Sequence, residues 1–191
     1  MNPAVERAIG RLLRPLRASE RHLAWNDPRL AEAPPDIRLT SAAFADGGAI
    51  PLRHAGAGVG ANLSPPLGWS GVPHHTAELA LIVQDPDAPL LRPVVHLIAL
   101  GLPPGRDGLE EGELAPDKSG GIRFGRGSFR RIGYAGPRPV RGHGPHRYVF
   151  QIVALVRPLP VPSEPDLAAT LAAMAGIVSA RGRLTGTFER S

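Results

Sequence analysis

Polar side chains that are capable of chemistry belong to three apolar segments of this chain or directly follow them. The segments are residues 77–85 (AELALIVQD), 94–102 (VVHLIALGL) and 146–156 (HRYVFQIVALV). The polar residues of interest are two carboxylates, two imidazoles, a guanidinium and a phenol, namely Asp85, Asp87, His96, His146, Arg147 and Tyr148. Polar groups at the edge of an apolar core cost free energy unless they are paired. We therefore predict that these groups meet around one cavity.

Such a cavity would suit an anionic ligand. Imidazolium, phenol and exposed backbone N–H groups donate hydrogen bonds to anionic oxygens. Asp85 or Asp87 would hold a histidine in its donor state and raise its pKa by charge proximity. Glycines let backbone amides approach a ligand closely, and this chain offers Gly133, Gly136, Gly142 and Gly144. The carboxylates would also accept from a ligand amine, so a zwitterionic head group is chemically reasonable.

Each residue taken alone has a less specific interpretation. An Asp-x-Asp pair caps a turn more often than it binds a metal, and a lone histidine on an apolar strand is more often satisfied within the core. His143 and His146 have the spacing of metal ligands, but the glycine and proline between them favour a loop at the pocket entrance. Arg147 alternates away from His146 and Tyr148, which favours a structural ion pair. We predict no metal site and no cofactor.

The three apolar runs predict central strands that are covered on both faces. Shorter strands are expected at 37–39 and 49–52, and a further strand at 183–190. A helix is expected over 165–180, with Ser163 or Glu164 near its start and Gly182 just past its end. Pro86 and Pro89 restrict the backbone of the carboxylate turn. The sequence leaves the cis or trans state of the X-Pro bonds open.

Residues 1–36 are expected to form a helical extension and a proline-rich linker, and residues 37–191 the main domain. Apolar residues of the extension recur at helical spacing with arginines largely between them, and Asn2 before Pro3 is typical of a helix start. The extension has three interpretations. It is a helix packed across its own domain, the arm of a homodimer, or a helix on a membrane surface.

Composition narrows the class of protein. The formal net charge is +5 and Lys118 is the only lysine, but the arginines are scattered and aromatic residues make up 5%, which disfavours nucleic-acid binding. The 23 glycines and 22 prolines favour many turns over a helical bundle. Cysteine is absent, which excludes disulfides and thiolate chemistry. With no run of transmembrane length and no secretory signal pattern, we expect a cytoplasmic protein without stable membrane insertion.

Five motifs occur in an order and at separations that resemble one protein family. They are 62–73 (NLSPPLGWSGVP), 85–89 (DPDAP), His96, 133–139 (GYAGPRP) and 142–150 (GHGPHRYVF). From about Ile37 to Arg190 the chain is similar to the phosphatidylethanolamine-binding protein family. It resembles in particular the bacterial branch, which is often labelled Raf kinase inhibitor-like.

The resemblance implies a mainly β fold, with a sandwich-like core and a few peripheral helices. It also implies a pocket for phosphate-bearing and other small anions at one end of the large sheet, without an established catalytic cycle. Carried over residue by residue, the ligand-binding set is Asp85, Asp87, His96, His146, Tyr148, Gly136, Pro86 and Pro89, with Ala88 in the wall. The candidate rim residues are Arg138, Arg141 and His143.

Departures from the family pattern lie at the pocket mouth. Arg138 stands where the bacterial loop usually has a small residue, and Val140 replaces a second proline. Val95 and Leu97 replace the aromatic residues that often flank the strand histidine. We therefore expect a mouth that is wider, more basic and less aromatic than is usual for the family.

Three functions are compatible with these residues. The first is a protein that binds small anions or phospholipid head groups and is not an enzyme. The second is an interaction module that inhibits a kinase or protease through the pocket rim, where Arg138 and Arg141 would recognise an acidic or phosphorylated peptide. The third is a hydrolase that uses Asp85 and His96 as a general-base pair, although the sequence has no Gly-x-Ser-x-Gly elbow.

Overall fold

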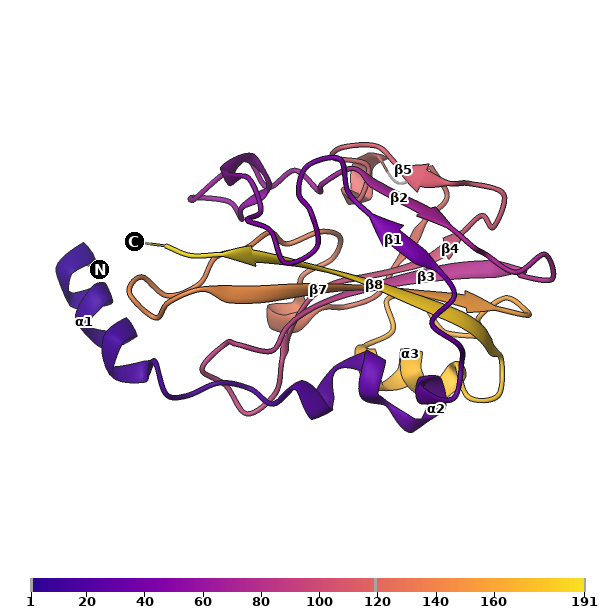
Figure 1. Cartoon of the computed structure of the whole chain (residues 1–191), viewed down its shortest axis with the longest axis horizontal. Helices are drawn as coiled ribbons and strands as arrows, with labels where there is room; N and C mark the ends of the chain where they lie inside the picture. The colour runs from indigo at the N-terminus through magenta and orange to yellow at the C-terminus, as the bar shows by residue number, and fades with distance from the viewer. Residues whose placement is uncertain (1, 119, 191) are drawn as a thin grey trace.

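The protein, described here by a computed structural model, is built around two antiparallel β-sheets (Figure 1). The structure describes residues 2–118 and 120–190. The larger sheet has the strand order β6-β4-β3-β7-β8 and the smaller one the order β1-β2-β5. The larger sheet contains β6 (Arg123–Phe124), β4 (Val94–Leu102), β3 (Glu78–Asp85), β7 (His146–Leu155) and β8 (Val178–Phe188). The smaller sheet contains β1 (Arg38–Thr40), β2 (Leu67–Ser70) and β5 (Gly108–Leu109).

Strand β3 is the centre of the larger sheet and is buried on both faces. Its odd-numbered apolar residues Leu79, Leu81 and Val83 pack into a core between the two sheets. Ala80 and Ile82 point to the opposite face and pack in a second core with residues such as Met174. Alternate side chains of a strand point to opposite faces, so two cores require an apolar residue at nearly every position. The continuous apolar runs predicted these central strands, and their bounds differ from the expected ones by a residue at most.

The strand ends that carry the polar residues lie side by side. Because β3 pairs antiparallel with both β4 and β7, its last residues adjoin the first residues of both neighbours. Asp85 pairs with Val94, and Gln84 pairs with Val149. The prediction that the polar residues of three strands share one end of the sheet is therefore confirmed.

Two expected elements are different in the structure. Residues 49–52 form a single bridge, between Ala49 and Thr187, and then enter a 3-10 turn. The expected helix over 165–180 is shorter: α3 spans Leu167–Ala173, is capped by Asp166, and is followed by Gly176 with φ +72°. Residues from Val178 onward join β8 because β7 extends to Leu155 and pairs with them. Pairing along the whole length of β7 thus overrides the helical pattern.

In the N-terminal segment, α1 (Pro3–Leu13) lies beyond the end of the larger sheet, and the residues after it run along that sheet to α2 (Pro28–Ala31) (Figure 1). Helix α1 begins at Asn2, whose side chain accepts from the Ala4 N–H, as predicted. The segment continues through two 3-10 turns (Glu20–His22 and Ala24–Asn26) to α2. The expected linker thus contains a short helix, and Leu30 of that helix is buried in the second core.

Polar anchors hold this segment to the sheet. The Gln84 side chain accepts from the Ala24 N–H at 2.7 Å, and the Gln151 side chain accepts from the Trp25 N–H at 2.6 Å. Arg181 donates to carbonyl oxygens of the segment and stacks over the Trp25 ring, 4.0 Å from its centroid. Among the described residues, no helix has both the length and the apolar character that crossing a membrane requires.

Candidate functional site

The end of the larger sheet where the polar residues meet contains a cavity of about 430 Å³. Asp85, His96, His146 and Tyr148 all line it. The remaining walls come from the turn after β3, from the loop before β7 and from residues around Phe129; they are Ala88, Pro89, Leu90, Val94, Val95, Ser128, Phe129, Arg131, Ala135, Gly136, Arg138, Pro139 and Val140. The size suits a small ligand or a head group.

His96 is fixed in one orientation at the start of β4. Its Nδ1 lies 2.5 Å from the Ala135 carbonyl oxygen, so Nδ1 carries a proton and donates to it. Burial lowers the pKa of His96, while the negative charge of Asp85 and the Ala135 carbonyl oppose this shift. The neutral ring therefore presents Nε2 as an acceptor.

Tyr148 contributes an unused donor. Its side chain is 1% exposed, and its hydroxyl forms no hydrogen bond with the residues that the structure describes. Burial, reinforced by the charge of Asp85, raises the pKa of Tyr148 well above its ordinary value, so the hydroxyl stays protonated. The backbone N–H of Arg138 approaches the hydroxyl oxygen and opposes this shift, but it leaves the hydroxyl proton without an acceptor. Its ring meets that of His96 edge-on, with centroids 5.1 Å apart. A buried hydroxyl without a partner costs free energy, and a ligand oxygen in the cavity would supply that partner.

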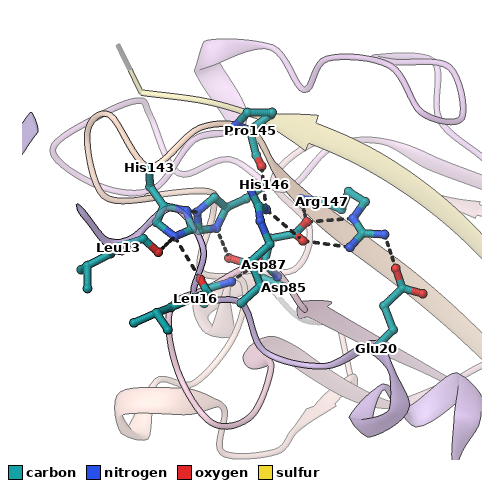
Figure 2. A network of polar contacts seen from close by, with 11 residues as sticks. Leu13, Leu16, Glu20, Asp85, Asp87, His143, Pro145, His146 and Arg147 are labelled. Carbon is teal, nitrogen blue, oxygen red and sulfur yellow. Dashed lines mark hydrogen bonds and ion pairs between the residues drawn. The ribbon is translucent and has the colours of Figure 1, made fainter. Parts of the chain in front are cut away.

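Asp85 faces His146, which is the first residue of β7. Its Oδ2 lies 2.7 Å from His146 Nδ1, and its Oδ1 accepts from the N–H groups of Asp87 and Ala88 at 2.7 and 3.1 Å. The carboxylate therefore shapes its own turn as well as fixing the imidazole. His146 Nε2 lies 2.8 Å from His143 Nδ1 (Figure 2). The expected pairing of a carboxylate with a histidine is present, but Asp85 bonds to His146 and His96 bonds to a carbonyl.

Asp87 was predicted to bind the ligand, but it is not among the residues that line the cavity and bonds to Arg147 instead (Figure 2). It accepts from the backbone N–H, Nε and Nη2 of Arg147 at 2.8 Å each, and Arg17 Nη1 lies 3.0 Å from its Oδ1. Burial alone would raise the pKa of Asp87, but the hydrogen bonds from Arg147 outweigh it and hold the pKa at about 2. Arg147 forms the structural ion pair that its position on the strand predicted.

The loop before β7 is held by Asn62 and not by a ligand. Gly136 was expected to offer its backbone amide, but this N–H donates to the Asn62 side chain at 2.8 Å. A Cβ at Gly136 would lie 2.1 Å from the His54 carbonyl oxygen, so glycine is required there for close packing. The buried Gly56 also holds this loop, because its N–H donates to the Pro137 carbonyl at 2.8 Å.

The mouth of the cavity is basic and apolar. Arg131 and Arg138 line it and are exposed, and among the described residues neither forms an ion pair. Phe129 is 74% exposed and adopts a left-handed backbone, φ +58°. The remaining predicted rim residues lie elsewhere: Arg141 contacts Glu6 of α1, and His143 is 0% exposed behind His146. Pro86 also lies outside the lining residues, whereas Pro89 belongs to them.

Sequence reasoning missed several residues that build the site. Arg131, Ser128 and Phe129 line the cavity but belong to a segment without a recognisable motif. Asn62 adopts φ +56°, and its place within the motif 62–73 was the available signal for a structural role. No group of three or more metal-ligating side chains is positioned to hold an ion within residues 2–118 and 120–190.

Comparison with known proteins places this geometry in context. The sequence profile of the family described as phosphatidylethanolamine-binding protein matches residues 40–189. A UPF0098 protein of Aquifex aeolicus is 36% identical over 156 residues, which are 81% of this chain and 89% of that protein. A putative lipoprotein of Mycobacterium tuberculosis, LppC, is 38% identical over 159 residues, covering 83% of this chain and 75% of that one.

Solved structures agree with the sequence comparisons. The structure of Escherichia coli YbcL, described as a member of the mammalian PEBP family, has a TM-score of 0.76 at 29% identity and covers 82% of this chain and 99% of that one. The putative phosphatidylethanolamine-binding protein homologue CT736 of Chlamydia trachomatis has a TM-score of 0.74 at 33% identity, with the same coverage. The profile match begins at residue 40, so α1 and the rest of the N-terminal segment lie outside it.

Proposed function

This chain belongs to the phosphatidylethanolamine-binding protein family, and we propose that it binds small anions of the phosphate class, phospholipid head groups included, in the cavity between β3, β4 and β7. The observation that carries the proposal is the Tyr148 hydroxyl. It is buried at the cavity next to His96, and its proton has no acceptor among the residues that the structure describes. An anionic oxygen satisfies it, and the unpaired guanidinium groups of Arg131 and Arg138 attract such a ligand to the mouth.

The protonation state of the cavity defines which anion fits best. Neutral His96 presents an acceptor at Nε2, whereas Tyr148 presents a donor. A phosphate monoanion has both a P–OH group that donates and oxygens that accept, so it complements this pair. A ligand without such a proton, such as acetate or the phosphodiester of a phospholipid head group, requires that His96 take one up. The site therefore favours protonated phosphates near neutral pH and accepts other small anions as the pH falls.

Calorimetric titration of the full chain with inorganic phosphate, phosphoethanolamine and acetate tests the proposal. We expect inorganic phosphate to bind at pH 7 and phosphoethanolamine to bind below about pH 6, because each has a P–OH group under those conditions. Affinity should fall about tenfold or more in His96→Ala, because the acceptor of that group is removed. His75→Ala, at an exposed turn position, is the matched control. A folded chain that shows no heat with any of the three ligands would refute the proposal.

The other predictions stay open. Inhibition of a kinase or protease through the rim rests on Arg138, because Arg141 contacts Glu6 of the same chain. Hydrolysis by an Asp85–His96 pair lacks the direct hydrogen bond that it needs, since each group bonds to another partner. A cytoplasmic location and the absence of enzymatic activity also stay predictions.

A further inference from the structure

A chain of three hydrogen bonds links the N-terminal segment to the cavity. The carbonyl oxygens of Leu13 and Leu16 lie 3.0 and 3.2 Å from His143 Nε2. His143 Nδ1 lies 2.8 Å from His146 Nε2, and His146 Nδ1 lies 2.7 Å from Asp85 Oδ2 (Figure 2). The three residues are at most 3% exposed, so these bonds are shielded from solvent. The two carbonyl oxygens share one proton of His143 Nε2, and each of the other two contacts needs one proton, so three protons are needed in all.

Counting the protons in this series of hydrogen bonds shows how many the Asp85–His146 pair must hold. A carbonyl oxygen only accepts, so His143 Nε2 carries a proton. If His143 is neutral, its Nδ1 is an acceptor, and His146 Nε2 must carry the second proton. His146 Nδ1 then faces a carboxylate oxygen, and a third proton is needed between them. Two neutral histidines supply only two protons, so the Asp85–His146 pair holds one more.

We propose that the N-terminal segment, acting through the positioning residue His143, keeps this additional proton on the Asp85–His146 pair and so keeps the pair electrically neutral toward a bound anion. The inference rests on the anion-binding function proposed above. Without the carbonyl oxygens of Leu13 and Leu16, His143 adopts the other tautomer and donates from Nδ1 to His146. Two protons then suffice, and Asp85 adds an uncompensated negative charge to the cavity.

The contacts of the segment suit this role. Gly10 of α1 lies directly on the loop before β7, since a Cβ there would lie 1.9 Å from the Arg141 carbonyl oxygen. Arg14 Nε donates to the Gly142 carbonyl at 2.9 Å, and the Ala18 N–H donates to the Ala88 carbonyl at 2.9 Å. The segment thus holds both loops that flank His143 and Asp85.

Neighbouring charges favour the same distribution of protons among His143, His146 and Asp85. Several charged and titratable groups surround the hydrogen-bonded series of His143, His146 and Asp85. They are Arg17, Asp87, His96, Arg131, Arg147 and Tyr148. Burial, together with the positive charges of His146 and Arg17, lowers the pKa of His143, although the Leu16 and Leu13 carbonyls oppose this. The additional proton therefore stays on the side of Asp85 and His146.

The first test is the protonation of the His146 ring, observed by ¹⁵N NMR of the full chain at pH 7.5 without ligand. We expect a proton on Nε2 in the unmodified chain and its loss in His143→Phe, which removes the acceptor. His143→Asn, whose side-chain oxygen replaces Nδ1 as the acceptor, retains it. An unmodified chain whose His146 is protonated at Nδ1 alone would overturn the inference, whether or not phosphate binds.

The second test displaces the segment without shortening the chain. Gly10→Val forces α1 away from the Arg141 carbonyl, whereas Ala8→Val adds the same side chain at an exposed position of the same helix. We expect Gly10→Val and His143→Phe to lose the Nε2 proton and to bind phosphate about tenfold more weakly at pH 7.5. Ala8→Val should match the unmodified chain. Loss of the proton with unchanged phosphate affinity would overturn the link to the cavity.

Discussion

Asp85 and Asp87 stand two residues apart in one turn, yet they serve different parts of the molecule. Asp85 lines the cavity and bonds to the imidazole of His146. Asp87 faces the guanidinium groups of Arg147 and Arg17, which are permanently charged. Both carboxylates are almost completely buried. The type of partner, and not burial, therefore separates the binding side of the turn from its structural side.

The two sides of the turn also differ in whether their polar groups have partners. The structural side fastens the N-terminal segment, because Arg17 bonds to Asp87 and Glu20 bonds to Arg147. The binding side leaves a donor unused, since the Tyr148 hydroxyl has no partner among the described residues. Satisfied charges stabilise one side, and an unsatisfied hydroxyl destabilises the other. Stability and affinity should then respond to different substitutions.

The largest effect is expected from Asp87→Asn. Removing one member of a buried ion pair leaves the others uncompensated, and such changes cost about 3–5 kcal/mol. We expect a loss of about 3 kcal/mol in the free energy of unfolding, at the low end because the Arg17 and Arg147 side chains are 36% and 44% exposed. Urea denaturation measures it, with Asp117→Asn at an exposed position as the control. Phosphate affinity should change less than threefold.

Acid titration sharpens this prediction. The pKa of Asp87 is about 2 in the folded chain and near 3.8 in the unfolded chain. Its contribution is therefore complete above about pH 4 and disappears as the pH falls toward 2. In Asp87→Asn, the free energy of unfolding should no longer show this part of its decrease at low pH. A variant that is as stable as the unmodified chain at pH 7 would show that Asp87 does not differ from Asp85 in the proposed way.

Tyr148→Phe should have the second largest effect, with opposite signs for affinity and stability. Without the hydroxyl, phosphate loses a donor, and we expect affinity to fall about tenfold. The buried hydroxyl no longer needs a partner, so the free energy of unfolding should rise by about 1 kcal/mol. Tyr134→Phe is the matched control, because the Tyr134 hydroxyl donates to the His54 carbonyl at 3.1 Å and its loss should destabilise. Equal effects of the two variants would contradict the assignment.

The division between Asp85 and Asp87 shows where sequence reasoning succeeds. The three central strands and their shared end were predictable, because strands that are buried on both faces need apolar residues at nearly every position. The separate orientations of the two aspartates were not, since they depend on the backbone of the turn and on Arg17, which is 70 residues away from Asp87. No sequence signal indicated the partners of His143 Nε2, because these are backbone carbonyls of α1 and the segment after it. Backbone acceptors have no residue type that a pattern can detect.

The pH dependence of binding is the third prediction. Because burial lowers the pKa of His96, this ring is neutral near pH 7 and protonates in the cavity only when an anion compensates it. We expect acetate affinity to rise several-fold between pH 7.5 and 5.5, with proton uptake detected calorimetrically in buffers of different ionisation enthalpy. His96→Gln should abolish most of this rise. Affinity that is independent of pH would show that His96 does not touch the ligand.

The protonation of His96 should lower folding stability as the pH falls, whereas it raises the affinity for acetate. A histidine with a lowered pKa in the folded chain binds protons more readily when unfolded, so its effect is to reduce stability as the pH falls below about 6.5. Bound acetate should offset that loss in the unmodified chain and not in His96→Gln. Thermal denaturation at pH 5.5, with and without acetate, measures this effect in the unmodified chain and in His96→Gln.

The smallest effect is expected at the mouth. Arg138 is exposed, so it attracts an anion through solvent and contributes less than the buried groups. Arg138→Gln should weaken phosphate binding about threefold at low ionic strength, and the difference should vanish near 1 M salt because exposed charges are screened. Arg157→Gln makes the same charge change beyond the opposite end of β7 and should leave affinity unchanged. If both variants weaken binding equally, net charge and not the position of Arg138 attracts the anion.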